Sequence, residues 1–194
     1  MSEPEMSAIL VGGTPGTGKT KVAKMLGTRL SVHVVELGEL AEKAGCISAQ
    51  DKARDSGIID EDCLVNAIQV EVADITRQVI IVGHYIDLVP YSSIDHVFIL
   101  RTHPETLRHR LLARGWSEPK IIENVEAEVI GVCQLDAFES FGEDLVSEID
   151  TTDTAPAETV DKIQKMLKHP MESPRIDWLR QLEEEGRLDE FLSK

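Results

Sequence analysis

The chain has 194 residues, of which 42% are hydrophobic and 28% are charged, proportions typical of a globular protein with one substantial core. No apolar run approaches the roughly 20 residues that cross a bilayer, and the acidic start lacks the basic region of a secretory signal, so we expect no membrane association and a cytoplasmic location, or a nuclear one in a eukaryote. The formal net charge of −15 excludes nucleic-acid binding through a general basic surface.

Short apolar runs rich in β-branched residues alternate with helical patterns along the chain. The predicted strands are Ala8–Gly12, His33–Glu36, Val79–Gly83, His96–Arg101 and Leu145–Asp150. The predicted helices are Lys19–Leu30, Asp60–Arg77, Pro104–Arg114, Glu118–Phe138 and Ala157–Leu167. This alternation predicts an α/β fold with a five-stranded parallel sheet and helices on both faces.

Two segments between these elements are predicted loops, and a further helix is expected near the end of the chain. The loops are Gly45–Ile59, rich in glycine, serine and aspartate, and the short break Gly115–Ser117. After residue 170, the residues Ile176, Leu179 and Leu182 recur at helical spacing. They predict a docked amphipathic helix, with a partner-binding helix as the alternative.

The strongest motif is G-x-x-x-x-G-K-T over Gly13–Thr20, placed between an apolar strand and an amphipathic helix as a phosphate-binding loop requires. Gly13, Gly16 and Gly18 permit positive φ and let the backbone approach phosphates closely. The freed backbone N–H groups then point at the anion.

The end of the motif supplies the charged and metal-binding groups. The N–H groups of Thr20 and Lys21 open the helix toward the anion. Lys19 is predicted to act on the β- and γ-phosphates of ATP, and the Thr20 hydroxyl to ligate Mg²⁺. The sequence therefore predicts an ATP–Mg²⁺ site with Lys19 as a catalytic residue.

A basic stretch stands out in this acidic chain. Residues 101–114 contain four arginines and one acidic residue, and Arg110 and Arg114 lie four apart on one helical face. Together with Arg101, which follows the strand, they are predicted to clamp phosphate; a solvated helix face is the alternative. No NKxD-like motif is present, which argues against a GTPase.

Several longer motifs resemble the adenylate kinase isoenzyme 6 group, small nuclear or archaeal ATPases with adenylate kinase activity that are linked to small ribosomal subunit maturation. The motifs are GTPGTGKT, VELGELA, IIDEDCLVNAI, VIIVGHYIDLVP and HVFILRTHPETLRHRLLARGWSEPKIIENVEAEV. The resemblance spans roughly residues 8–170. It implies a three-layer P-loop NTPase fold of the nucleoside monophosphate (NMP) kinase type.

This resemblance also implies an organisation and a set of site residues. It implies a kinase-like domain over 1–170, with a short NMP-binding segment at 36–59, a short lid at 113–123 and a helical tail at 171–194. The implied ATP contacts are Gly16, Gly18, Lys19, Thr20, Lys21 and Arg114. His84 and Asp87 fall on the family's Asp-x-His-Gly-like motif, in which the histidine is tied to hydrolysis. Ordinary hydrogen-bonded scaffold is the alternative interpretation of His84.

Three positions depart from the family pattern. Val82 replaces the carboxylate that supports Mg²⁺, and either Asp87 or water takes that place. Glu42 and Ile86 stand where arginines that clamp the AMP phosphate are expected. Lys43, Lys52 or Arg54 is left to supply that charge, and spacing does not choose among these three residues.

The preferred function is adenylate kinase activity (ATP and AMP to two ADP) with substantial ATP hydrolysis, because a short lid excludes water poorly. One rival is an ATP-driven assembly factor acting on a basic small-subunit ribosomal protein, without strong direct RNA binding. The acidity fits such a partner, although it also fits mere solubility. The other rival is a small-metabolite kinase.

Side chains of cysteine and histidine give no sign of a metal centre. Cys46, Cys63 and Cys133 are far apart and form no CxxC motif, so we expect buried thiols rather than a disulfide framework or a zinc site. The six histidines lack HxxxH or HExxH spacing, and we expect no transition-metal site built from protein side chains.

Overall fold

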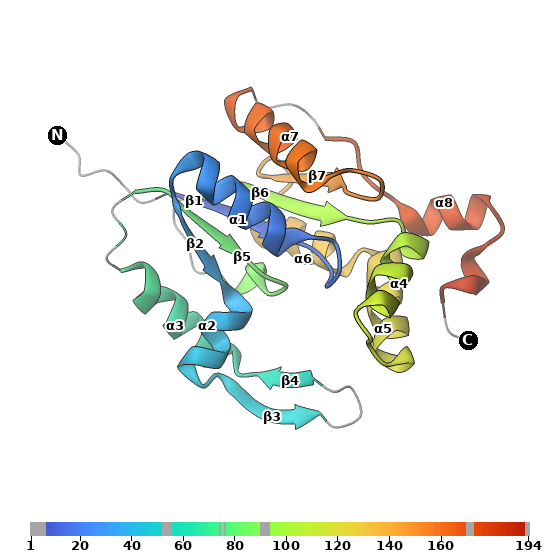
Figure 1. Ribbon diagram of the computed structural model, residues 1–194, viewed down its shortest axis with the longest axis horizontal. Helices are drawn as coiled ribbons and strands as arrows, with labels where there is room; N and C mark the ends of the chain where they lie inside the picture. Colours follow the sequence, from blue (N-terminus) through green and yellow to red (C-terminus); the bar gives the residue numbers. More distant parts are fainter. Residues whose placement is uncertain are drawn as a thin grey trace.

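The computed structural model describes residues 7–51, 56–73, 75, 77–89, 94–169 and 173–192. Its centre is a sheet of five parallel strands in the order β2-β5-β1-β6-β7 (Figure 1). The strands are β1 Ala8–Gly12, β2 His33–Glu36, β5 Val79–Val82, β6 Ile94–Arg101 and β7 Val146–Asp150. The predicted α/β fold with a five-stranded parallel sheet, a P-loop NTPase architecture of the NMP kinase type, is confirmed.

Helices cover both faces of the sheet, which explains why the strands are apolar throughout. The helices are α1 Lys19–Leu30 and α7 Pro156–Lys168 on one face, and α2 Leu37–Ala44, α3 Glu61–Val72 and α6 Val132–Phe141 on the other. Alternate residues of β1 serve the two layers, because successive side chains of a strand point to opposite faces. Ile9 and Val11 pack with α1 and α7, whereas Ala8 and Leu10 pack with α3 and α6.

A separate apolar cluster lies beyond the carboxyl ends of β1 and β6, where α4, α5 and α8 meet (Figure 1). These elements are α4 Pro104–Ala113, α5 Glu118–Ile130, α8 Trp178–Glu184 and the 3₁₀ turn η2 Leu188–Glu190. Leu107 and Leu111 of α4 contribute to the cluster, as do Leu182 and Phe191 from the end of the chain. The C-terminal segment, residues 173–192, thus packs on α4 and α5. Leu182 is buried and Leu179 is 39% exposed.

The segment expected to be the Gly45–Ile59 loop contains a hairpin, formed by β3 Ile47–Asp51 and β4 Ser56–Ile59. It projects from the edge of the molecule below α2 and α3 (Figure 1). Lys52 and Arg54, two candidates for the AMP clamp, lie outside the described residues.

Two predicted helices are shorter than expected. The helix predicted over Glu118–Phe138 is two helices, because Gly131 has a φ of 74° and ends α5 before α6 begins. The helix predicted over Asp60–Arg77 ends at Val72. In both cases apolar residues continue past the true end, so periodicity alone does not mark it.

The expectation that all cysteines are separate thiols is wrong for two of them. Cys46, just after α2, forms a disulfide with Cys63 in the first turn of α3. The β3–β4 hairpin returns the chain to its starting point, and the Asp60 N–H donates a hydrogen bond to the Cys46 carbonyl at 2.8 Å. Folding of the insertion therefore brings together two residues that are 17 apart in sequence. Cys133 is a buried free thiol.

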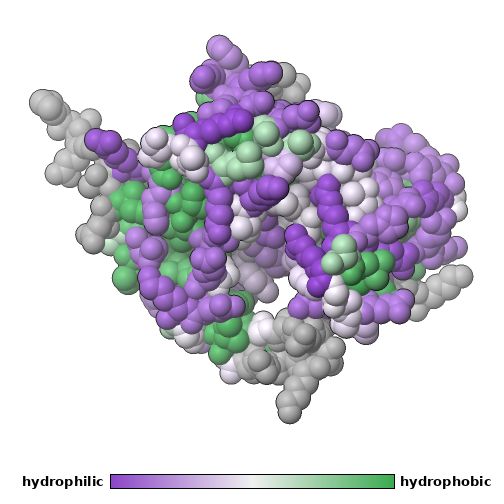
Figure 2. All heavy atoms as spheres, in the orientation of Figure 1, coloured by the Kyte–Doolittle hydropathy of each residue, from purple (hydrophilic) through white to green (hydrophobic). Residues whose placement is uncertain are grey.

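The surface is hydrophilic over much of α4, α5 and α8, and it is hollowed between these helices and the α2–hairpin side (Figure 2). Among the helices in the described ranges, none combines the length and apolar character needed to span a bilayer.

Candidate functional site: a phosphate loop with two adjoining pockets

The backbone of residues 13–20 adopts the conformation that its glycines were predicted to allow. Gly13, Gly16 and Gly18 have φ angles of 136°, 101° and 93°. A Cβ atom on Gly13 would lie 2.4 Å from the Leu100 carbonyl oxygen, and one on Gly16 would lie 2.6 Å from Leu107 Cδ1. Gly13 therefore requires glycine for space, since it faces a backbone carbonyl, and both positions require it for backbone angle.

Lys19 is held at the start of α1 by the loop itself. Its Nζ donates to the Thr14 carbonyl at 3.5 Å, and the Thr17 hydroxyl donates to the same carbonyl at 2.9 Å. Loss of hydration on burial lowers the pKa of Lys19 to about 8. In the free protein Lys19 therefore holds its proton less tightly than a lysine in water does. An anion bound at the phosphate loop would offset the cost of burying the Lys19 charge.

A pocket of about 480 Å³ opens in front of this loop. Four cations line it, namely Lys19, Lys21, Lys24 and Arg114, together with Gly16, Gly18 and Thr20. Every ATP contact implied by the family resemblance therefore lines one pocket. The concentration of positive charge and helix N–H groups suits a polyanionic phosphate chain.

A second pocket of about 250 Å³ adjoins the first and shares Gly16, Gly18 and Arg114 with it. Its opposite wall comes from the loop after β7 and from α7, through Thr151, Thr154, Pro156 and Thr159. These four residues were not predicted as site residues. They carry no motif, and the folded sheet brings them to the phosphate loop because β1 and β7 lie on either side of β6.

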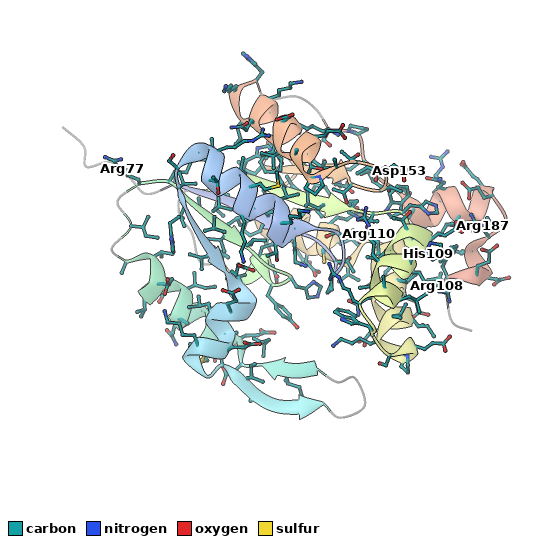
Figure 3. All side chains as sticks on the ribbon, viewed as in Figure 1. Arg77, Arg108, His109, Arg110, Asp153 and Arg187 are labelled. Atoms are coloured by element: carbon teal, nitrogen blue, oxygen red, sulfur yellow. A yellow bond between two sulfur atoms is a disulfide. The ribbon has the colours of Figure 1, made fainter. Side chains whose placement is uncertain are left out.

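Arg110 lines the second pocket, but its hydrogen bonds serve the scaffold. Its guanidinium donates to the carbonyls of Thr151 and Thr152 at 2.7 and 2.8 Å and to the Thr102 hydroxyl at 3.3 Å. Figure 3 shows Arg110 extending from α4 toward the loop that carries Asp153. Arg110 thus fixes a pocket wall, and of the arginine pair Arg114 alone lines the cationic pocket.

Arg101 does not belong to a phosphate clamp, contrary to the sequence prediction. Its side chain is 1% exposed and pairs with Glu128 at 2.9 Å and Glu148 at 2.8 Å. A basic stretch in the sequence did not reveal these partners, because they lie 27 and 47 residues away.

His84 lies after the carboxyl end of β5, next to the phosphate loop. Its Nδ1 is 3.3 Å from Cys133 Sγ, and its ring also bonds to the Gly13 backbone. Burial lowers the pKa of His84, and the nearby charge of Lys19 lowers it further. Burial raises the pKa of the Cys133 thiol to about 11. A neutral imidazole and a neutral thiol therefore face each other beside the phosphate loop at pH 7.

Asp87 follows in the 3₁₀ turn η1 Ile86–Leu88. Burial raises the pKa of Asp87, and the negative charges of Asp136 and Glu61 raise it as well. This side of the site is therefore acidic. Sequence reasoning did not predict Asp136 or Cys133, both on α6, as site residues, because neither belongs to a local motif.

The residues present fit Mg²⁺ held mainly by phosphate and water. Thr20 lines the cationic pocket, while Val82 is 1% exposed and offers no oxygen ligand. Within the described ranges, no three histidine, cysteine or acidic side chains are grouped so as to hold a metal ion. Mg²⁺ characteristically keeps several waters and takes one or two protein ligands in addition to substrate phosphates.

The acceptor side offers little positive charge in the part of the NMP segment that the structure describes. In residues 36–51 and 56–59, Lys43 is the one basic residue. Its Nζ lies 3.7 Å from Glu71 of α3. Ile86, at one of the expected arginine positions, is 3% exposed and belongs to the core.

The chain also has recognisable relatives. Residues 9–131 match a protein-family profile described as "AAA domain". A protein of Thermococcus onnurineus described as "Putative adenylate kinase" is 41% identical over 160 residues, which cover 82% of this chain and 83% of that protein. An Archaeoglobus fulgidus protein with the same description is 37% identical over 192 residues, or 96% and 98% of the two chains. The chain belongs to this adenylate kinase-like family.

Solved structures extend the likeness at the level of fold. This adenylate kinase-like chain superposes on a shikimate kinase from Bacteroides thetaiotaomicron with a TM-score of 0.55 and 15% identity, covering 84% of this chain and 98% of that one. At that identity the likeness shows a shared fold alone.

Proposed function

We propose that this protein is an adenylate kinase that transfers the γ-phosphoryl group of ATP to AMP and also hydrolyses ATP at a substantial rate. The observation that carries the proposal is the pair of adjoining pockets. One is lined by four cations around the glycine loop, and the other is a smaller, largely uncharged pocket of a size that suits a nucleoside. The names of the relatives point to the same reaction.

In the proposed complex, Lys19 bonds the β- and γ-phosphates in place of the Thr14 carbonyl. Arg114, which lines both pockets, binds the phosphate chain at the junction with the nucleoside. Thr20 is the protein ligand of Mg²⁺, which neutralises phosphate charge when bound. The chemistry is then mainly positioning and charge stabilisation of the transferring group.

Hydrolysis is proposed to accompany transfer for two reasons. The connection between α4 and α5 consists of only residues 114–117, so the lid is short and excludes water poorly. His84 is neutral at pH 7 and is able to orient a water molecule through a ring nitrogen. We assign Asp87 to the same water or to the Mg²⁺ hydration shell.

The deciding experiment follows ADP and phosphate from ATP–Mg²⁺ with AMP, CMP, UMP, GMP or no acceptor. We expect AMP to give two ADP per AMP consumed, and slower phosphate release without any acceptor. Lys19→Ala should lower both rates by several orders of magnitude while the far-UV circular dichroism is retained. ADP formation that no nucleotide accelerates would contradict the kinase assignment. Phosphorylation of a non-nucleotide acceptor would support a small-metabolite kinase instead.

A role in small ribosomal subunit biogenesis is a second candidate, favoured by the net charge of −15 and by the resemblance described above. In this role ATP turnover would drive the release of a basic ribosomal protein. Surface-binding titrations should show association with that class of protein that slows steeply as salt rises, and weak binding to ribosomal RNA alone. Binding that salt does not affect would leave the acidity as a solubility feature.

A further inference from the structure

One buried carboxylate, that of Glu128, connects the phosphate loop with the end of β6 and with the C-terminal segment. Glu128 lies in the last turns of α5 and is 1% exposed. Its Oε2 accepts a hydrogen bond of 2.5 Å from the Thr14 hydroxyl. Its Oε1 accepts from Arg101 Nε at 2.9 Å, from the Thr102 N–H at 2.9 Å and from Trp178 Nε1 at 3.3 Å. Oε1 thus accepts from three protein donors and Oε2 from one.

One further hydrogen bond links Thr14 to the proposed reaction centre. The Thr14 carbonyl accepts from Lys19 Nζ and from the Thr17 hydroxyl. Holding the Thr14 side chain therefore orients the carbonyl that receives Lys19. Because the loop backbone approaches the phosphates directly, a small displacement of Thr14 changes both the N–H groups and the lysine.

The other side of the carboxylate is anchored by the C-terminal segment, residues 173–192. Arg101 donates to the Ile176 carbonyl at 3.1 Å, and Trp178 donates to Glu128. Glu148 also pairs with Arg101 and accepts from the Ile176 N–H at 3.4 Å, but these contacts lie outside the route from Trp178 through Glu128 to Thr14. At the surface, Arg187 pairs with Glu105 of α4 at 3.1 Å.

We propose that Glu128 is a positioning residue that sets the phosphate loop through Thr14, and that Trp178 and the C-terminal segment fix Glu128 for this role. This inference rests on the proposed nucleotide function of the loop. By this proposal the end of the chain helps to hold the phosphate loop in its nucleotide-binding conformation. The C-terminal segment holds the carboxylate without reaching the pocket itself.

Glu148 provides a matched control for Glu128. Both carboxylates are buried and both pair with Arg101, but the hydrogen bonds of Glu148 go to Arg101 and Ile176, not to the phosphate loop. Glu128→Gln keeps the shape but places an amide where Thr14 needs an acceptor. Glu148→Gln removes an equivalent charge from Arg101 and leaves the Thr14 contact intact.

The experiment measures ATP affinity by calorimetry and turnover in the full-length chain. Loss of a charge-assisted buried hydrogen bond should weaken ATP binding roughly ten- to hundredfold in Glu128→Gln. Glu148→Gln should lower thermal stability similarly but keep the wild-type affinity. Thr14→Val should weaken binding as Glu128→Gln does, and the double variant should be no worse than either single one. Thr14→Ser should retain more affinity than Thr14→Val.

A spectroscopic readout tests the connection to the C-terminal segment. The chain has two tryptophans, so Trp116→Phe leaves Trp178 as the only indole. In that background ATP should change the Trp178 emission, and Thr14→Val should abolish the change at saturating ATP.

The outcomes separate the two proposals. A wild-type chain that binds no ATP would overturn the proposed function. A wild-type chain that binds ATP, with Glu128→Gln and Glu148→Gln equal in affinity, would overturn the positioning role alone. If Glu128→Gln does not fold, Thr14→Val decides, because it leaves the ion pairs of Arg101 in place; wild-type affinity in that variant would likewise refute the inference.

Discussion

A lysine that loses hydration before its ligand arrives holds its proton less tightly, so at a pH near or above its lowered pKa it takes up a proton when an anionic ligand binds. Lys19 is in this state, with a pKa lowered to about 8 by burial. A phosphate chain beside it favours the charged ammonium and raises that pKa again. Nucleotide binding and protonation of this residue are therefore linked, and the linkage has a definite sign.

We predict that ATP affinity falls as pH rises above about 8, by up to tenfold per pH unit, because the free protein must take up a proton to bind. Calorimetry in two buffers of different ionisation enthalpy should reveal that proton at pH 8.5 but not at pH 6.5. Lys19→Arg is the control, since arginine stays protonated and its affinity should not change over this range. Equal proton uptake by both proteins would refute the linkage.

His84 leads to a different expectation, because its proposed partner is water and not phosphate. His84→Ala should leave the ATP dissociation constant within about twofold and lower AMP-independent phosphate release by roughly 10²-fold or more. Because its pKa is lowered, hydrolysis by the wild-type chain should stay constant from pH 8 to 7 and decline only at acidic pH. Parallel losses of binding and turnover would instead assign His84 to the scaffold.

At the scale of elements, the prediction was correct for those elements whose conformation depends on residues that lie close together in the sequence. The strand β1, the phosphate loop and α1 were predicted at their observed bounds, because apolar alternation, glycines and an amphipathic face are all contained in that stretch. The break at Gly131 and the β3–β4 hairpin were missed, since polar hairpin strands lack an apolar pattern. Glu128 is 114 residues from Thr14, and no local signal reports such a contact.

The Cys46–Cys63 bridge closes a loop that contains the β3–β4 hairpin and runs from just after α2 to the first turn of α3. Closing a loop of this length restricts the unfolded chain by about 3 kcal/mol. We predict that Cys63→Ser lowers the free energy of unfolding in urea by about that amount. A reductant should lower the stability of the wild-type chain similarly and leave Cys63→Ser unchanged. If the reductant destabilises the variant as much as the wild-type chain, the effect does not arise from the bridge.

At the scale of the whole molecule, the C-terminal segment has two structural roles, one in apolar packing and one in a buried charge network. It closes the apolar cluster of α4 and α5 through Leu182 and Phe191. It also completes the buried charge network through Trp178 and Ile176. A protein that removes or displaces this segment would therefore disturb packing and the phosphate loop together.

The four cations of the phosphate pocket lie in a molecule whose net charge is −15, so an approaching nucleotide meets two opposing fields. At 0.01 M salt the Debye length is about 30 Å and the whole molecule repels ATP, whereas at 0.15 M it is about 8 Å and mainly the pocket is felt. We predict that the association rate of a fluorescent ATP analogue, measured by stopped flow, rises severalfold between these salt concentrations. Uncharged adenosine should show no such rise, and a steady fall for ATP would mean that the pocket dominates at all distances. If the predicted rise is observed, added salt speeds the capture of ATP by this protein, although salt weakens most encounters between charged molecules.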